Sequence, residues 1–201
     1  MKRVIILSIS FFILNYSLNS KFRKLTYREK IILRKNLART ALSYVNSKYR
    51  FDCSGFIKHI MKKNHISIFN RQMIYTSHSN GVKLIYNTLK RYHKIFKDVR
   101  RANIGDLIFF NNTYDKNRNR RLDDRLTHIA IIVKKYKDGT IKYVHSSNKG
   151  IKVGYMNLYR KNIYKYKNRI INSFLRRKKK NDSPYTKYLS GELFYSFGTI
   201  F

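Results

Sequence analysis

Apolar residues recur at helical spacing between residues 27 and 47. They fall three or four positions apart, as on the buried face of an amphipathic helix. These positions are Ile31, Ile32, Leu37, Ala41, Leu42 and Val45. Thr26 precedes them and Glu29 follows three residues later, which is the pattern of a capping box. We therefore expect a helix that begins directly after Thr26.

A second helix is expected from about Cys53 to Lys63. Residues 48–52 interrupt the apolar spacing, and Asp52 can cap the next segment by accepting hydrogen bonds from the N–H groups of its first turn. Residues 70–97 also have helical spacing and predict one or two further helices. Their apolar positions are Ile74, Leu84, Ile85, Leu89, Ile95 and Phe96.

Beyond Arg101 the helical spacing gives way to short β-branched and aromatic runs, which are typical of strands. Asp138 and Gly139 form a strong hairpin signal. The last segments are less regular: residues 157–160 predict the start of a short helix, and residues 191–197 a strand or a short helix. The predicted strands lie in Gly105–Phe110, where a turn comes first, and in Thr127–Val133, Thr140–Ser147 and Gly150–Tyr155.

Helices followed by antiparallel strands predict an α+β fold, in which the N-terminal helices pack on a mainly antiparallel sheet. The chain has 201 residues, 43% of them hydrophobic, which suits one domain with a substantial core. One proline and 8 glycines leave no low-complexity linker. We expect a single domain over residues 21–201.

The first 20 residues have the shape of a targeting segment. Met1–Arg3 is positively charged, and Val4–Leu14 is apolar but shorter than the roughly 20 residues of a membrane-spanning helix. This predicts a signal peptide, with export to the periplasm, the cell envelope or the medium. Because Leu18–Ser20 lacks a small-x-small cleavage pattern, an uncleaved anchor is the alternative. No transmembrane domain is expected after cleavage.

The formal net charge is +35, from 45 Lys and Arg against 10 Asp and Glu. A field this positive favours polyanionic partners such as nucleic acid, anionic lipid or acidic cell-wall polymers. The basic residues are spread along the chain and accompany no recognisable nucleic-acid-binding motif. We therefore expect an anionic envelope polymer rather than a specific nucleic acid.

Cys53 is the only cysteine, so it cannot form a disulfide within the chain. It stands at the predicted start of a helix, where the helix dipole lowers the pKa of a thiol and favours a nucleophile. Such a nucleophile needs a base within hydrogen-bond reach and a third group that orients the base. His128 opens a predicted strand and His145 lies near the end of the returning strand, which makes them candidates.

The other four histidines are poorer candidates. His59 and His65 lie on or just after the helix of Cys53 and are not well placed as its base. His78 and His93 lie in polar, helix-like surroundings, and we expect surface roles for them.

Strand parity places His128 and His145 on the same face of a hairpin centred on Asp138–Gly139. A strict two-residue turn would put His145 opposite Ile132, about 13 Å along the strand from His128. Direct contact therefore requires a wider turn or a bulge. The spacing alone is equally compatible with a purely structural role, in which the two histidines form hydrogen bonds inside the strand pair.

Four motifs occur in order within residues 44–155. They are Asp52–Phe56 (Asp-Cys-Ser-Gly-Phe), Gly105–Phe110, His128–Ile131, and Val144–Ser147 followed by Gly150–Val153. In these motifs the chain resembles the NlpC-type cell-wall cysteine peptidases, which have papain-like α+β domains and are related to the CHAP amidases.

The resemblance implies that Cys53 is the nucleophile, His128 its general base and His145 the residue that orients the base. It implies hydrolysis of amide bonds in peptidoglycan stem peptides, without a metal or another cofactor. Backbone N–H groups near Cys53 and Ser54 are candidates for binding the oxyanion of an acyl-enzyme pathway. Tyr44 and Tyr49 are candidates for the groove tyrosine of the family.

The chain departs from the family pattern in ways that bear on its substrate. The Gly-Gly block before the cysteine is absent, Ala130 stands where glycine is common, and an insertion covers Asn111–Leu126. The insertion has the spacing of a calcium loop, but Arg120 and Leu126 replace its glycine and its bidentate glutamate. We interpret it as a degenerate site. Its candidate ligands are Asp115, Asn117, Asn119, Asp123 and Asp124.

Two other functions stay open from the sequence. The same site could serve an amidase or acyltransferase that acts on a substrate outside the wall. Alternatively, the chain could be a non-catalytic cationic protein that binds the envelope.

Overall fold

The computed structural model describes residues 25–67, 81–180 and 182–201. The predicted signal peptide, the first part of the predicted helical region 70–97 and His78 lie outside these residues. Among the described residues, no helix has both the length and the apolar character needed to cross a membrane. The helices are α1 (Tyr27–Ser43), α2 (Cys53–Lys63), α4 (Gly81–Arg91) and α5 (Ser190–Leu193).

The first two helices begin where their capping residues predict. Thr26 accepts a hydrogen bond from the Glu29 N–H, and the Glu29 carboxylate accepts one from the Thr26 N–H at 2.8 Å, which completes the capping box. Asp52 caps α2, whose bounds are those that the sequence predicts. The helix α1 ends earlier than expected, at Ser43.

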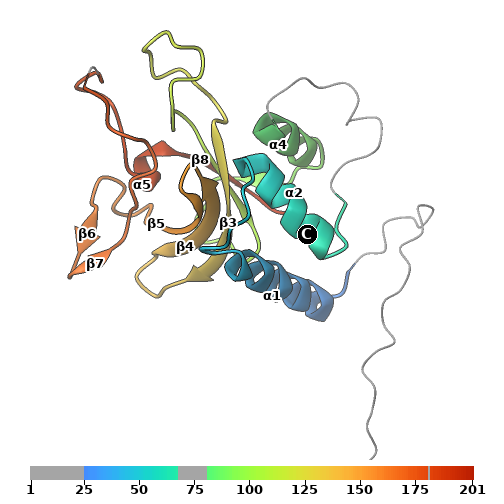
Figure 1. Cartoon of the computed structure of the whole chain (residues 1–201). Helices are drawn as coiled ribbons and strands as arrows, with labels where there is room; N and C mark the ends of the chain where they lie inside the picture. The colour runs from blue at the N-terminus through green and yellow to red at the C-terminus, as the bar shows by residue number, and fades with distance from the viewer. Residues whose placement is uncertain (1–24, 68–80, 181) are drawn as a thin grey trace, which may run out of the picture.

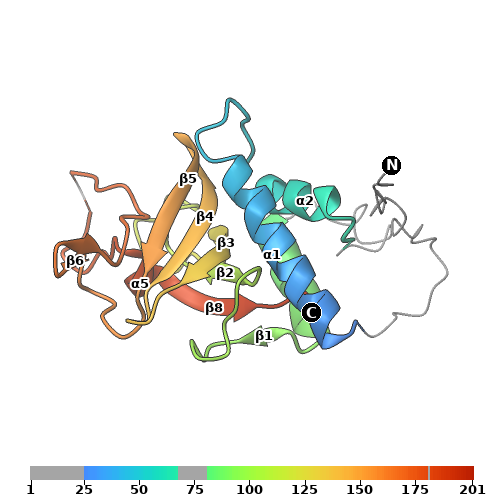
Figure 2. The ribbon, with the colours of Figure 1, turned by 90° about the horizontal axis from the view of Figure 1, so that it is seen from below.

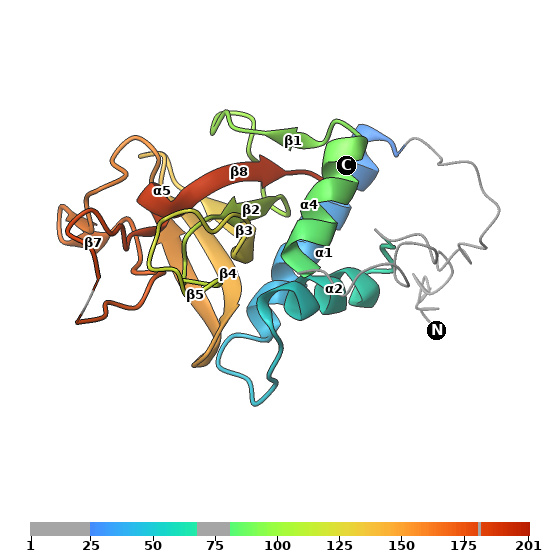
Figure 3. The same ribbon diagram turned by 90° about the horizontal axis from the view of Figure 1, so that it is seen from above.

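The strands form a six-stranded sheet and a separate two-stranded hairpin. The order in the main sheet is β1-β8-β2-β3-β4-β5, and each of its pairings is antiparallel. Figure 3 shows β8 running between β1 and β2. The bounds are β1 (Ile95–Phe96), β2 (Leu107–Phe110), β3 (His128–Lys135), β4 (Ile141–Ser147), β5 (Gly150–Met156), β6 (Lys165–Tyr166), β7 (Arg169–Ile170) and β8 (Phe194–Gly198).

Both faces of the sheet are covered. The helices α1, α2 and α4 lie on one side (Figures 1 and 2), and their apolar side chains pack on Leu107, Phe109 and Ile131. Ile108 and Phe110 point to the opposite face, where the C-terminal part of the chain covers them. Because β2 is buried on both faces, it is a continuous apolar run rather than an alternating one. This arrangement confirms the predicted α+β fold.

The β3–β4 hairpin has a register that the strict two-residue turn does not give. Its pairing begins at Lys135 and Ile141 and shifts by one residue between Ile132 and Lys134. The wider turn and this bulge move the register by two residues in total, so that the pair of Ile131 and Val144 places His145 diagonally across from His128. The offset along the strands falls from about 13 Å to about 7 Å, which histidine side chains can span.

Three local predictions need correction. Ile95 and Phe96 form β1 rather than a helix, since they pair with β8 at the edge of the sheet. Residues 157–160 form a turn, because the Asn157 side chain accepts hydrogen bonds from the N–H groups of Tyr159 and Arg160 and so closes the backbone locally. The tail contains both alternatives, the short helix α5 and then β8. The hairpin β6–β7 was not predicted.

A buried ion pair attaches the turn before β2 to α1. Asp106 is 1% exposed, and it accepts hydrogen bonds from Arg34 Nη1 at 2.6 Å and from the Asn103 N–H at 2.8 Å. Arg34 also donates to the Ile104 carbonyl oxygen at 2.9 Å. Gly105 has a φ of +82°, and an added Cβ would lie 3.2 Å from the Arg34 backbone. The turn therefore needs glycine.

We predict that Asp106→Ala lowers the free energy of unfolding by about 3 kcal/mol, because it leaves the mostly buried Arg34 guanidinium without its carboxylate and the Asn103 N–H without its acceptor. Urea unfolding followed by circular dichroism measures this change. The matched control is Asp98→Ala, which removes a carboxylate that pairs with Arg100 at the surface, and it should hardly move the midpoint. Equal shifts for the two variants would contradict a special role of the buried pair.

Candidate active site

Cys53 is the first residue of α2, and Asp52 fixes the helix start around it. Asp52 Oδ1 accepts hydrogen bonds from the N–H groups of Ser54 at 2.8 Å and Gly55 at 2.7 Å. It also accepts one from the Ser54 hydroxyl at 2.7 Å. These bonds satisfy two of the unpaired N–H donors of the first turn. They also hold a carboxylate next to the thiol.

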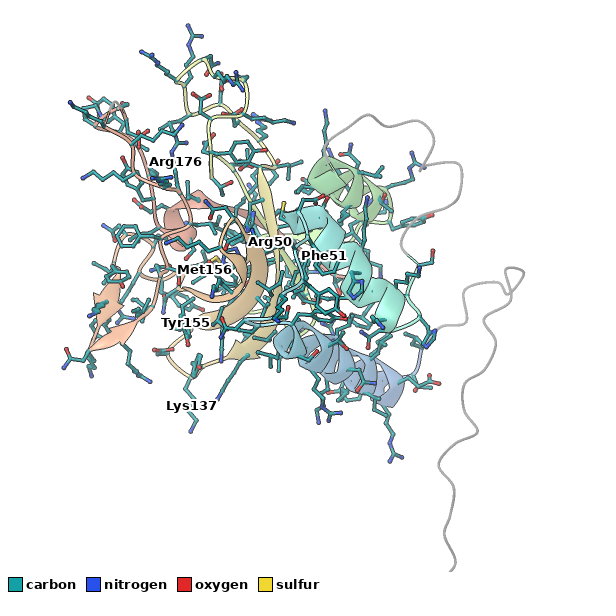
Figure 4. The ribbon with its side chains drawn as sticks, in the orientation of Figure 1. Arg50, Phe51, Lys137, Tyr155, Met156 and Arg176 are labelled. Atoms are coloured by element: carbon teal, nitrogen blue, oxygen red, sulfur yellow. The ribbon has the colours of Figure 1, made fainter. Side chains whose placement is uncertain are left out.

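The start of α2 enters an opening between β3 and β4. The ladder of these strands ends at Ile131 and Val144, whereas β4 stays paired with β5 as far as Ser147. Within the opening, the Ser146 hydroxyl donates to the Phe51 carbonyl oxygen, and the Ile129 N–H donates to the Cys53 sulfur. Figure 4 shows Phe51 between the sheet and α2. The thiol therefore lies against the strand that carries His128.

His128 and His145 contact each other directly. His128 Nε2 lies 2.8 Å from His145 Nδ1, and the two rings are nearly perpendicular, at 85°. His145 is only 8% exposed, whereas His128 is half-buried. The Tyr143 ring packs against His145, and the Phe110 ring against His128. The structure thus joins the two histidines and sets Cys53 beside the residue that follows His128.

Burial, together with the Asp52 carboxylate, raises the pKa of the Cys53 thiol to about 11. The N–H groups of Ile129, Ser54 and Cys53 act in the opposite direction but do not offset this effect. The expectation of a lowered thiol pKa is therefore wrong for the free enzyme. The main physical reason is that burial disfavours the charged thiolate, and the second is that the capping carboxylate places a negative charge at the end of the helix where the dipole is positive.

Both imidazoles are neutral at neutral pH. Burial lowers the pKa of His128 well below its ordinary value, and the neighbouring His145 lowers it further. Burial alone lowers the pKa of His145 to about 4. Together with the raised thiol pKa, these directions predict a neutral thiol and two neutral imidazoles in the resting site rather than a thiolate–imidazolium pair.

Ser54 and the two candidate tyrosines have other contacts as well. Ser54 is 8% exposed, and both its N–H and its hydroxyl donate to Asp52. The Tyr44 hydroxyl lies 2.7 Å from His59 Nε2. Tyr49 stacks on Phe51, with ring centroids 6.1 Å apart, and is 60% exposed. Tyr49 is therefore the tyrosine with the larger free surface.

Tyr114, which belongs to the insertion, was not predicted from the sequence to be a site residue. Burial and then the nearby Cys53 raise the pKa of Tyr114, so its hydroxyl is an electrostatic neighbour of the thiol. Its side chain is 48% exposed. The N–H and hydroxyl of Thr113 bond to Thr127 Oγ1 at 3.0 and 2.9 Å, which ties the loop to the residue before His128. The one feature of the sequence that indicated a place for Tyr114 near the site was the position of the insertion directly before the histidine motif.

The acidic part of the insertion is held by its own hydrogen bonds. The Arg120 N–H donates to Asp115 Oδ2 at 3.1 Å, and the amides of Asn117 and Asn119 donate to Asp123. Within residues 25–67, 81–180 and 182–201, no group of three or more His, Cys, Asp or Glu side chains is arranged to hold a metal ion. These hydrogen bonds hold together the loop that carries Tyr114.

A single thiol at a helix start, set against a strand with a histidine pair, is the side-chain set of a cysteine hydrolase. The family model described as NlpC/P60 family matches residues 41–172. No curated protein and no solved structure matches the chain. Because the match covers more than half of the sequence, the chain belongs to the NlpC/P60 family. It is a cysteine peptidase or amidase of cell-wall peptidoglycan.

The raised thiol pKa predicts slow alkylation of the free enzyme. At pH 7 iodoacetamide should modify Cys53 roughly 300-fold more slowly than an ordinary thiol with a pKa near 8.5, and the rate should rise about tenfold per pH unit toward pH 11. Mass spectrometry of samples alkylated between pH 6 and pH 10.5 measures the profile.

The matched variant for this measurement is His128→Gln. Since neutral His128 contributes no charge to the thiol, the variant should be alkylated within about threefold of the wild-type rate at pH 7. A rate plateau below pH 8 that disappears in the variant would instead demonstrate a thiolate–imidazolium pair.

Proposed function

We propose that this protein is an exported hydrolase that cleaves amide bonds in peptidoglycan stem peptides through Cys53, His128 and His145, with an acyl-enzyme intermediate. The observation that carries the proposal is the contact of His128 Nε2 with His145 Nδ1, next to the strand residue that donates to the thiol. The family supplies the class of substrate. The charged and apolar segments of residues 1–20 support export.

The histidine contact allows either ring to donate, and the proposed mechanism uses the direction that leaves a lone pair on His128 Nδ1. His128 donates its Nε2–H to His145 Nδ1, so that His128 Nδ1 carries a free lone pair. This lone pair accepts the Cys53 proton. His145 is neutral and buried, so it orients His128 but does not stabilise an imidazolium as a carboxylate would.

The first half of the reaction removes the amine product. As the sulfur attacks the amide carbonyl, the S–H proton moves to His128, the S–C bond forms and the carbonyl electrons move to oxygen. Proton removal accompanies the attack, because the thiol is not ionised beforehand. The C–N bond then breaks, and the His128 imidazolium gives its proton to the leaving nitrogen.

The second half releases the acid product. A water molecule loses a proton to His128 and attacks the thioester carbonyl; the C–S bond then breaks, and the His128 imidazolium returns the proton to the sulfur, which restores the thiol. The Cys53 N–H lies at the free end of the helix, where it can stabilise the oxyanion in both halves. The Ser54 N–H contributes less, because it already donates to Asp52.

We predict that Cys53→Ala abolishes release of stem-peptide fragments from purified peptidoglycan, and that His128→Gln lowers kcat/KM at least about 100-fold. His145→Ala should lower kcat roughly tenfold with little change in KM, and His145→Gln, which can still accept the Nε2–H, should recover part of the loss. Mass spectrometry identifies the products and liquid chromatography their rates.

The control for this series is His93→Asn, since His93 is exposed and has a φ of 55° that asparagine tolerates. It should leave kcat/KM unchanged. Fragment release by Cys53→Ala at the wild-type rate would refute the mechanism. Hydrolysis of a soluble amide without any action on peptidoglycan would instead favour an amidase with a substrate outside the wall.

The second proposed role is that Tyr114 lines the substrate groove beside the thiol. Tyr114→Ala should raise KM for a soluble stem peptide about tenfold and change kcat less than twofold, because the ring contributes to binding in both the ground and the transition state. The KM of Tyr114→Phe should lie between those of the wild type and Tyr114→Ala. Tyr185→Ala, at a tyrosine that is 82% exposed, is the control. A fall in kcat at unchanged KM would contradict a binding role.

A further inference from the structure

The hairpin β6–β7 lies on the side of the sheet opposite α1, α2 and α4 (Figures 1 and 2). Its strands are joined by Lys167 and Asn168, whose φ values of 46° and 60° are those of a type I′ turn. Every residue from 161 to 170 is exposed. We call residues 159–174 the arm.

Cations and aromatic rings alternate on the arm and contact one another. The Arg160 guanidinium lies 4.3 Å from the ring centroid of Tyr166, and Lys167 Nζ lies 5.7 Å from the same ring. The Tyr164 and Phe174 rings lie 5.0 Å apart, and Phe174 is 63% exposed. Exposed rings gathered in this way, with cations around them, mark an interaction surface rather than scattered surface residues.

The arm has almost no compensating negative charge. The sequence contains no Asp or Glu between Asp138 and Asp182. Asp138 approaches Arg169 at 3.8 Å, while Lys161, Lys165 and Lys167 form no ion pair with any other described residue. This surface therefore favours an anionic ligand.

The base of the arm is fixed to the core. Asn172 is wholly buried, and its Nδ2 donates to the carbonyl oxygens of Arg160 at 2.7 Å and Ile163 at 2.8 Å. Its Oδ1 accepts from the Asn157 N–H at 2.8 Å. The arm thus presents its side chains from a preformed backbone, which reduces the ordering cost of binding.

We propose that the arm binds a phosphate-bearing glycan polymer of the cell wall and holds the enzyme on its insoluble substrate. The lysines and Arg160 suit phosphodiester groups, and the exposed tyrosine faces suit the apolar faces of sugar rings. A wall polymer is favoured over nucleic acid because the family acts on the wall. The choice of polymer therefore rests on the proposed function, while the arm itself is defined by its own contacts.

The test is co-sedimentation of the full chain carrying Cys53→Ala with cell walls that bear phosphodiester-linked glycan, at 0.15 M salt. In this background the arm variant replaces Lys161, Lys165 and Lys167 by Gln. The matched control replaces Lys35, Lys83 and Lys90, which are exposed on α1 and α4, by Gln. Circular dichroism and the Tm verify that both variants fold.

We expect the arm variant to bind at least tenfold more weakly, and the control to stay within twofold. Walls treated with hydrofluoric acid, which removes phosphodiester-linked polymers, should bind the wild type and the arm variant equally weakly. Tyr166→Leu should weaken binding about threefold at unchanged net charge, through the loss of the ring that positions Arg160 and Lys167.

Three results would overturn the proposal. Equal losses in the arm variant and the control would show that only net charge matters. Full binding to the acid-treated walls would exclude the phosphate-bearing polymer as the ligand. Tighter, arm-dependent binding of a 20-nucleotide single-stranded DNA at the same salt would make the arm a nucleic-acid site. In the active background, the arm variant should cleave a soluble stem peptide at the wild-type rate, which separates this proposal from the proposed catalytic function.

Discussion

The site depends on the early end of the β3–β4 ladder. If the two strands stayed paired beyond Ile131 and Val144, the backbone of Ile129 would face β4 and no space would remain for the start of α2. The opening instead lets Phe51 and Cys53 take the hydrogen bonds of Ser146 and Ile129. The same hairpin contains the register shift that brings His128 to His145. One irregular strand pair therefore controls both the position of the thiol and the contact of the two histidines.

Asp52 shows how one residue can stabilise the fold and restrain its chemistry. Its carboxylate accepts from Ser54 and Gly55 and so fixes the first turn of α2. The same carboxylate contributes to the raised pKa of Cys53. Because His128 is neutral, it adds no positive charge beside the thiol in the free enzyme. In the proposed mechanism the thiol therefore stays protonated until a substrate carbonyl and a base act on it together.

Local chemistry made much of the fold predictable. The capping residues Thr26 and Asp52 gave both helix starts, and the apolar runs gave β2, β3, β4 and β5 within a few residues. The predictions failed where tertiary pairing decides. Ile95 and Phe96 fit a helical spacing, but they become a strand because β8, from the end of the chain, pairs with them. The hairpin β6–β7 has no buried face and therefore no alternating pattern.

Predictions for the candidate site also failed where tertiary structure decides. The histidine pair followed from parity, but its contact required a bulge that nothing in the sequence indicates. The predicted direction of the Cys53 pKa shift was wrong because a helix dipole is opposed here first by burial of the thiol and then by the charge of the capping carboxylate. Tyr114 was missed because a residue in an insertion has no periodic pattern that assigns its direction.

The few acidic residues explain why the cationic surface stays available to a polyanion. Several of them serve local structure: Glu29 and Asp52 cap helices, Asp106 pairs with Arg34, and Asp182 pairs with Arg176. Figure 4 places Arg176 on the C-terminal segment, where it also donates to the Asn112 carbonyl oxygen at 2.8 Å and supports the base of the insertion.

Acids used in this way cannot neutralise the surface lysines, whose mutual repulsion favours a less compact chain. An anionic polymer that binds the folded protein relieves this repulsion and stabilises the fold by mass action. The proposed adsorption to the wall and the stability of the folded state therefore depend on the same positive charge.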